Sequence, residues 1–287
     1  MNFLINYIVL AEIFVIAGMS TNILVGIVGI FTVSQAAIFG VGAYTVGGLT
    51  VAGTMGFIPA LAVGAAICII LNVVVTLPAL RVSGDYFVVT SFGIQLFASA
   101  VFINWTDVTG GAIGLFGIPS PEAFGLAVDT PSGMMILTTL AMAIAILCFW
   151  LVMRSPYGKL LKALREDELA VASAGKSVLI AKVSAAGLAG AFAGVAGGFY
   201  AAFISFIDPS SFELEVSVLL LTMVVVGGAR TLAGSIIGPF LLLSIPQVLS
   251  LVDIPSSLAA PLRGLLYGAL LIAFMLLRPQ GIAGQRI

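Results

Sequence analysis

The sequence predicts an all-α polytopic membrane protein: a bundle of about eight or nine transmembrane helices with one short helix outside the membrane. Of the 287 residues, 61% are hydrophobic and 8% are charged, whereas a soluble domain carries about 25% charged residues. The mean hydropathy is +1.25. Because spans of about 20 residues use most of this length, we expect residues 1–287 to form a single transmembrane domain.

The same composition excludes several functions. A chain with so little polar surface is not a secreted enzyme, a nucleic-acid-binding module or a disordered scaffold. It contains no histidine, and Cys68 and Cys148 each lie within an apolar run. We therefore expect no metal site and no cofactor. Membrane lipid is expected to surround the spans.

Hydropathy, together with the placement of glycine, proline and charge, defines the spans in order. The first, 6–30, is too long for one straight helix and is interrupted by Ser20, Thr21 and Asn22, so it is one tilted or broken span, or two short ones. Segment 214–229 is the other place where the count stays open. The expected segments are 6–30, 36–54, 57–79, 86–103, 134–153, 183–205, 214–229, 231–250 and 261–277.

The connections alternate between basic and acidic, which predicts the orientation. Segment 154–182 holds six of the eleven basic residues, and Arg81, Arg230, Arg278 and Arg286 fall on the same side of the expected topology. The opposite connections carry Asp107, Glu122, Asp129, Asp208, Glu213, Glu215 and Asp253, with Arg263 as the exception. We expect 154–182 and the C-terminus to be cytoplasmic, and the N-terminus to lie outside if 6–30 crosses once.

Small residues recur every four positions in three of the spans. Such rows allow close approach of helices in lipid, so tight packing is the favoured interpretation and a row lining a path is the alternative. The rows are Ala186, Gly190, Gly194 and Gly198; Gly234 and Gly238; and Gly264 and Gly268.

Polar groups within the spans are few, and they are the default functional candidates because they are costly in lipid. Glu12 is the one acid in a clearly apolar run, and we place it near an end of its helix. Gln35 and Gln95 either touch a substrate or form interhelical hydrogen bonds. An ion-driven carrier usually needs buried carboxylates, so the energy source is expected to lie in another chain.

Segment 154–182 contains the clearest local pattern. Ser155 and Pro156 form a good helix start, an apolar face follows, and Gly175 is a natural stop, which predicts a short amphipathic helix over about 159–174. The acidic cluster Glu166, Asp167 and Glu168 favours a protein partner over anionic lipid. We expect the side chains of Glu166 and Glu168 to face water or that partner.

Gly175, Lys176 and Ser177 resemble the end of a phosphate-binding P-loop. That pattern needs glycine where Ala170 stands, and it must follow a strand. If ATP drives this protein, a partner subunit supplies the nucleotide site.

Arg165-Glu-Asp-Glu168, followed seven residues later by Gly175, resembles the coupling loop of the permease subunits of branched-chain amino acid ABC importers, of the LivM type. Similar stretches run along most of the chain: 35–44, 78–87, 109–115 with 117–119, 192–200, 208–212, 226–230 and 277–281. The chain departs from the family at three positions. The family often has His where Gln35 stands, Asn or Asp where Ile113 stands, and Glu where Gln95 stands. These departures affect the substrate assignment more than the family.

The resemblance implies an assembly that works by alternating access. Its other parts are a second permease subunit of the LivH type, two cytoplasmic ATP-binding subunits and an extracytoplasmic substrate-binding protein. Segment 104–133 would help to receive the binding protein. The ATPase groove would hold Arg165, Glu166, Asp167, Glu168 and Gly175, and the substrate path is assigned to Gln35, Tyr44 and Gln95.

Two other classes stay open. A channel or facilitator for urea or short amides would need no acidic coupling helix and would work without ATP. A membrane-embedded enzyme is disfavoured because the spans hold no histidine and no paired acids. If the chain is an importer subunit, two points stay open: which amino acid or amide is transported, and whether the permease is a homodimer or a heterodimer.

Overall fold

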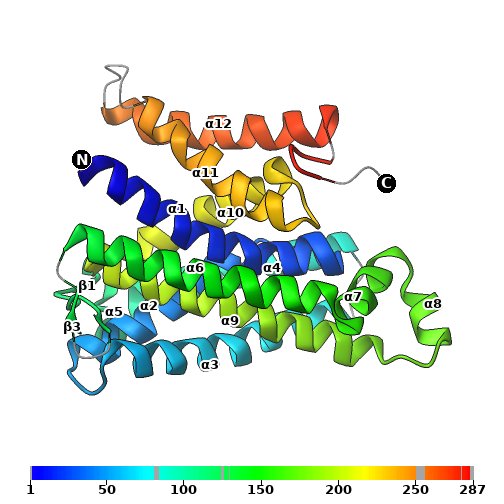
Figure 1. The fold of residues 1–287 in the computed structure, drawn as a ribbon, viewed down its shortest axis with the longest axis horizontal. Helices are drawn as coiled ribbons and strands as arrows, with labels where there is room; N and C mark the ends of the chain where they lie inside the picture. Colours follow the sequence, from blue (N-terminus) through cyan, green and yellow to red (C-terminus); the bar gives the residue numbers. More distant parts are fainter. Residues whose placement is uncertain are drawn as a thin grey trace.

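The computed structural model describes residues 2–80, 84–123, 126–128, 130–249, 256–278 and 280–284. Long helices run side by side and make up most of it (Figure 1). At one end of the bundle lie α7 (Pro156–Glu166) and α8 (Glu168–Ser173), and we call this the α7–α8 end. At the other end, the sheet end, β1 (Leu115–Phe116) pairs antiparallel with β4 (Phe206–Ile207). The predicted all-α membrane bundle is confirmed.

Each expected apolar segment corresponds to a helix. Within the described residues, six helices are long and apolar enough to span a membrane, and α2, α11 and α12 contain shorter apolar stretches. The helices that correspond to the expected segments are α1 (Asn2–Thr21), α2 (Gln35–Val51), α3 (Phe57–Thr76), α4 (Gly84–Asn104), α6 (Pro131–Arg154), α9 (Val178–Ile204), α10 (Leu214–Gly227), α11 (Leu232–Leu249) and α12 (Ser256–Leu277).

The remaining elements are short and lie in the connections. They are a π-helix, η1 (Asn22–Val28), the 3₁₀ turns η2 (Leu77–Leu80), η3 (Gly111–Ile113) and η4 (Pro209–Phe212), the one-turn helix α5 (Thr106–Thr109), and a second antiparallel pair, β2 (Glu122–Ala123) with β3 (Leu126–Ala127). Arg81, Asp129, Asp253 and Arg286, and the side chains of Glu122 and Arg263, lie outside the described residues.

The first apolar segment crosses the bundle once. At Asn22 the α-helix continues as η1, so the chain is helical from Asn2 to Val28, and Gly29 then ends it at φ +83°. The N-terminus consequently lies at the sheet end (Figure 1). The expectation that Glu12 sits near a helix end is wrong, because Glu12 lies in the middle of α1 and is buried. Its carboxylate accepts hydrogen bonds of 2.6 Å from the hydroxyls of Thr138 and Thr139 on α6.

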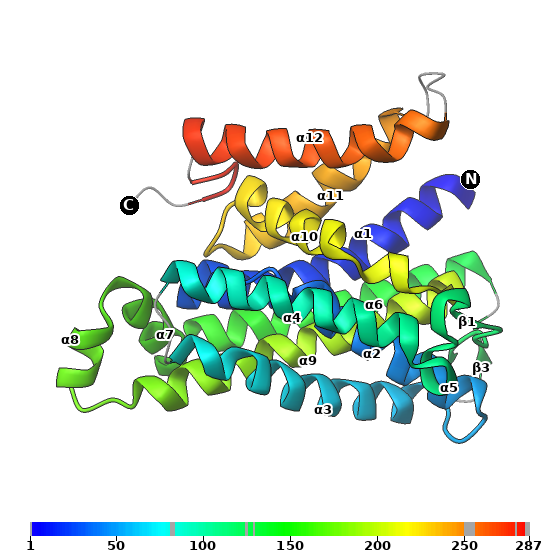
Figure 2. The ribbon, with the colours of Figure 1, turned by 180° about the vertical axis from the view of Figure 1, so that it is seen from behind.

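Helices α1 and α9 form the centre of the bundle, with α3 on one side and α12 on the opposite side (Figures 1 and 2). Aromatic rings fill the interior towards the sheet end. The ring of Phe212 lies 5.6 to 6.1 Å, between centroids, from those of Phe39, Tyr44, Phe102 and Tyr200. These rings join α2, α4 and α9 to the 208–212 turn.

The small-residue row of α9 lies against α3 and α2. A β-carbon on Gly194 would lie 2.9 Å from the Cβ of Cys68 and 3.0 Å from the Cα of Ala65, and one on Gly190 would overlap the carbonyl of Cys68. A β-carbon on Gly198 would lie 2.5 Å from a methyl of Leu61. Close backbone approach therefore requires glycine along this row.

The other two rows differ from each other. Gly234 and Gly238 face α10, where a β-carbon would overlap backbone carbonyls of Gly228 and Met223. Among the described residues, nothing lies within 4 Å of a β-carbon built on Gly264 or Gly268. The α12 row is therefore not used for packing within this part of the chain.

Candidate functional site

The loop between α6 and α9 is folded, and its start follows the predicted pattern. Ser155 caps α7 by accepting a hydrogen bond of 3.2 Å from the amide of Gly158, and Pro156 occupies the first helical position. Leu161 and Leu164 are buried against the bundle. Helix α7 is thereby fixed to the ends of the spans.

The prediction of one helix over 159–174 is wrong, because Asp167 divides it. Its backbone is extended, at φ −157° and ψ 107°, between α7 and α8. Its carboxylate accepts hydrogen bonds from the amides of Leu169 (2.8 Å) and Ala170 (3.1 Å) and so caps α8. Aspartate is among the best N-cap residues, and an extended cap ends one helix where it starts the next. Asp167 therefore has a structural role within the acidic cluster.

The loop ends on Gly175 and Ser177. Gly175 lies in the left-handed region, at φ +74°, and follows the end of α8, a conformation that disfavours side chains with a β-carbon. Ser177 then caps α9 by accepting a hydrogen bond of 3.3 Å from the amide of Ile180. These two residues set the direction in which the chain re-enters the bundle.

Arg165 points into the bundle. Its guanidinium donates a hydrogen bond to the carbonyl of Gly26 in η1, and its Cγ would lie 2.9 Å from a β-carbon on Gly29. Burial lowers the pKa of Arg165, the nearby positive charge of Arg230 lowers it further, and Glu166 partly offsets both. Arg165 is therefore an internal contact of the loop.

The expectation that Glu166 and Glu168 face only water or a partner needs correction. Glu166 forms an ion pair of 3.0 Å with Arg230, and Glu168 forms one of 2.5 Å with Lys182. The glutamate side chains are 62% and 52% exposed, whereas the Lys182 side chain is 9% exposed. Reversing both glutamates to lysine would place like charges beside Arg230 and Lys182 and would destabilise the loop itself.

One exposed residue of this loop was not predicted. Leu169, the second residue of α8, is 82% exposed. A cleft of about 690 Å³ lies between the loop and the bundle, lined by residues that include Val28, Phe31, Arg165, Glu166 and Val225. The sequence pattern of this loop was interpreted by its charges. The signal that could have identified Leu169 is an isolated leucine directly after three acidic residues.

Gln35 and Gln95 both lie at the buried start of α2, where Gln35 is the first residue and Gln95 binds the backbone of Ala37. The amide nitrogen of Gln35 donates to Asn72 (3.3 Å), and its carbonyl accepts from Ser20 (2.9 Å). Gln95 accepts from the backbone amide of Ala37 (3.0 Å). It also accepts from the Ser217 hydroxyl (3.2 Å) and donates to the Phe212 carbonyl (2.8 Å). Both glutamines therefore make interhelical hydrogen bonds.

Tyr44 lies apart from this polar cluster, about two and a half turns further along α2. Among the buried side-chain nitrogen and oxygen atoms of the described residues, its hydroxyl alone has no hydrogen-bond partner. Tyr44 lines an apolar groove of about 440 Å³ between α2, α3 and α4. The three residues assigned to a path thus fall at two places.

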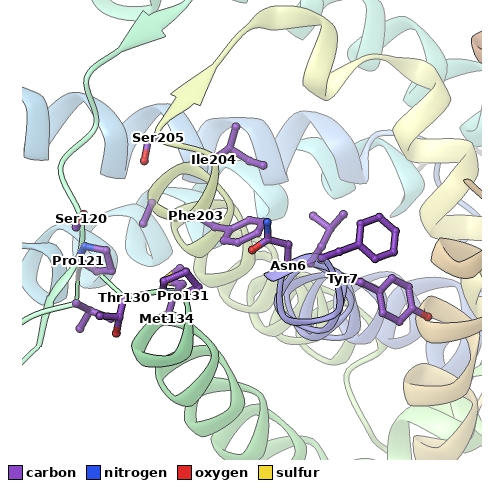
Figure 3. A pocket seen from close by; sticks show the side chains of 14 residues that line it. Asn6, Tyr7, Ser120, Pro121, Thr130, Pro131, Met134, Phe203, Ile204 and Ser205 are labelled. Carbon is purple, nitrogen blue, oxygen red and sulfur yellow. The ribbon is translucent and has the colours of Figure 1, made fainter. Parts of the chain in front are cut away.

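At the sheet end, a pocket of about 490 Å³ lies between the first turns of α1, segment 120–131 and the end of α9 (Figure 3). Asn6 projects towards Phe203, whereas Tyr7 points away and donates to the carbonyl of Phe240 on α11. All its lining residues within the described part of the chain are uncharged. Part of segment 104–133 therefore forms one wall of a neutral, partly polar pocket.

Two of the stretches that carry the family resemblance, 35–44 and 192–200, pack against each other within the bundle, and others lie at its two ends. At the α7–α8 end, the amide of Ile282 donates to the carbonyl of Val226 and the amide of Ala283 donates to the carbonyl of Gly227, both at 2.9 Å. At the sheet end, Leu115 pairs with Ile207, next to the 208–212 turn. Burial alone would raise the pKa of Asp208 in that turn, but hydrogen bonds from Ser210 and Ser211 outweigh it and lower the pKa.

An apolar helix bundle, with six of the eleven basic residues of the chain in a folded loop at one end, is the structure of a polytopic membrane protein. The chain belongs to the family described as branched-chain amino acid transport system, permease component, whose model matches residues 3–275. The predicted resemblance is confirmed.

The similar proteins carry consistent names. The chain is 28% identical to the high-affinity branched-chain amino acid transport system permease protein LivM of Escherichia coli K12, over 95% of this chain and 68% of that protein. Identity to the protein of the same name from Salmonella typhimurium LT2 is 28%, over 94% and 67%. The probable LivM permease of Methanocaldococcus jannaschii is 21% identical, over 76% and 65%. No solved structure matches the chain.

Proposed function

We propose that this chain is the membrane subunit of an ATP-driven importer of branched-chain amino acids, and that α8 docks on a cytoplasmic ATP-binding subunit. The observation that carries the proposal is the exposed Leu169 on a folded, partly acidic helix at one end of an apolar bundle. Burying this side chain against a protein partner would remove its apolar surface from water, which is favourable. The acids beside it disfavour anionic lipid.

The charge distribution supports a cytoplasmic position for the α7–α8 end. Positive residues within 15–20 residues of the spans favour the cytoplasmic side. Those at this end include Arg154, Lys162, Arg165, Lys182, Arg230 and Arg278, whereas Asp107, Asp208 and Glu213 lie towards the sheet end. The C-terminal residues up to 284 lie on the same side as α8.

The remaining partners follow from the family. A second permease of the LivH type would complete the path, two ATP-binding subunits would supply the energy, and an extracytoplasmic binding protein would deliver substrate at the sheet end. The neutral pocket beside segment 120–131 supports that delivery side, because it would not repel a zwitterion. Residues 1–287 act as a single domain in this proposal.

For the path itself, the role of the two glutamines is indirect. Gln35 and Gln95 hold the start of α2 in place through hydrogen bonds, and Tyr44 lines the apolar groove of α2, α3 and α4. An apolar surface of this kind suits a branched aliphatic side chain. This chain performs no covalent chemistry in the proposed mechanism.

The test is co-purification of the ATP-binding subunits with variants of Leu169. Leu169→Glu should reduce the recovered ATPase about tenfold or more, as for a buried interface anchor, because a carboxylate would enter an apolar contact. Leu169→Met keeps the apolar surface and should retain the ATPase. Equal recovery with both variants, in chains that elute as folded protein, would show that α8 is not the docking helix.

A further inference from the structure

The end of the first span is unusual in geometry. Seven consecutive residues, Asn22–Val28, form a π-helix, and all of them are buried. Such helices mostly occur as single turns and often mark functional sites. The last carbonyls of a helix have no partner within it. Here the carbonyl of Gly26 accepts a hydrogen bond from the Arg165 guanidinium, a cation placed where the helix dipole favours positive charge.

Asn22, the first residue of this π-helix, fixes it from another side. The side-chain oxygen of Asn22 accepts a hydrogen bond from the backbone amide of Arg230 (2.9 Å). Its side-chain nitrogen donates to the Thr231 carbonyl (3.1 Å) and the Ser235 hydroxyl (2.7 Å). A β-carbon on Gly26 would overlap the Asn22 side chain, so glycine is needed there. The π-helix is thereby tied to the turn between α10 and α11.

The α7–α8 loop closes this network. Glu166 forms its ion pair with Arg230, whose backbone lies in the left-handed region at φ +73°. That conformation is unfavourable for a residue with a β-carbon, so the contacts of Arg230 hold it there. Three segments far apart in the sequence, 22–26, 165–166 and 230–235, therefore share one set of polar contacts.

From η1 the connection continues into the bundle. In an apolar stretch of 18 residues within the Phe3–Val28 helix, 89% of the residues are buried, and α1 packs against α6, α9, α10 and α11. Any displacement of its end moves a helix that contacts most of the bundle. We infer that Arg165 is a positioning residue that couples the α7–α8 loop to α1 by capping η1, and is not a contact for the ATP-binding subunit. This inference rests on the proposed function.

We therefore expect that substrate uptake and ATP hydrolysis by the assembled transporter can be separated. In the full complex with its permease partner, ATP-binding subunits and binding protein, Arg165→Gln removes the cap of η1. The matched control is Lys162→Gln, which removes a positive charge from the exposed face of the same helix. Since a hydrogen bond to a charged group contributes about 1.5–3 kcal/mol, uptake in Arg165→Gln should fall about tenfold or more. ATPase recovery and ATP hydrolysis should stay at the level of the control.

Two results with the Arg165→Gln variant would overturn the inference. Loss of the ATP-binding subunits from Arg165→Gln would make the residue a docking contact, and uptake at the control rate would remove it from the coupling. If the parent chain itself binds no ATP-binding subunit, the proposed function fails instead. If the Arg165→Gln variant does not fold, the unsubstituted complex still tests the inference: amide hydrogen exchange in residues 22–29 should change when ATP binds. Unchanged exchange there would contradict the inference.

Discussion

Gly42 of α2 lies directly against Gly194 of α9: a β-carbon on Gly42 would sit 2.7 Å from the Gly194 Cα. The same face of α9 carries Gly190, which lies against the Cys68 carbonyl of α3, and Gly198, which lies against side chains of α3 and α2, so the three helices approach closely there. In lipid, where water does not drive helices together, packing of this kind is a main source of association. The contact therefore determines how closely the central helices can approach.

Gly194→Leu should prevent this packing. The new side chain would meet Cys68 and Ala65 of α3, and overpacking of this kind costs about 1–3 kcal/mol or more. We expect less folded protein in detergent, and a lower melting temperature in what remains. The matched control is Gly268→Leu, because a β-carbon on Gly268 meets nothing within 4 Å in the described residues. Equal yields and melting temperatures for the two variants would contradict the packing role.

Gln95→Leu should destabilise the bundle more than it alters transport preference. The substitution leaves the buried Ala37 amide and Phe212 carbonyl without their partner, at about 1–3 kcal/mol for each group. Gln95→Glu should be tolerated better, because a carboxyl oxygen can still accept from Ala37. Melting curves and competition among amino acids for uptake would check both. A changed substrate preference without loss of stability would place Gln95 on the path.

The Glu168–Lys182 pair should respond asymmetrically to substitution. Glu168→Gln leaves the buried Lys182 ammonium without its counter-ion, whereas Lys182→Met removes the buried charge itself. Because Glu168 is half exposed, we expect a cost of only about 1 kcal/mol for Glu168→Gln. Adding Lys182→Met to that variant should recover most of the loss. A double-mutant cycle by thermal unfolding measures this, and strictly additive effects would show that the pair contributes nothing.

Composition alone predicted the fold class, since no other fold satisfies so apolar a chain, and local signals placed Ser155 and Gly175 correctly at helix ends. The division at Asp167 was missed because its side chain was read as surface charge, although aspartate before a helical run is also a cap. The π-helix and the inward direction of Arg165 depend on segments over 100 residues apart, and no local pattern reports such a contact.

We propose that this chain carries a branched-chain amino acid by a mechanism that needs ATP. The direct measurement is uptake of labelled leucine by vesicles that contain the assembled transporter, with the binding protein outside and ATP inside. We expect accumulation above the external concentration with ATP, and none when ATP is omitted or when Leu169→Glu removes the ATP-binding subunits. Leucine or urea that enters equally without ATP and stops at equilibrium would contradict the claim and identify a facilitator.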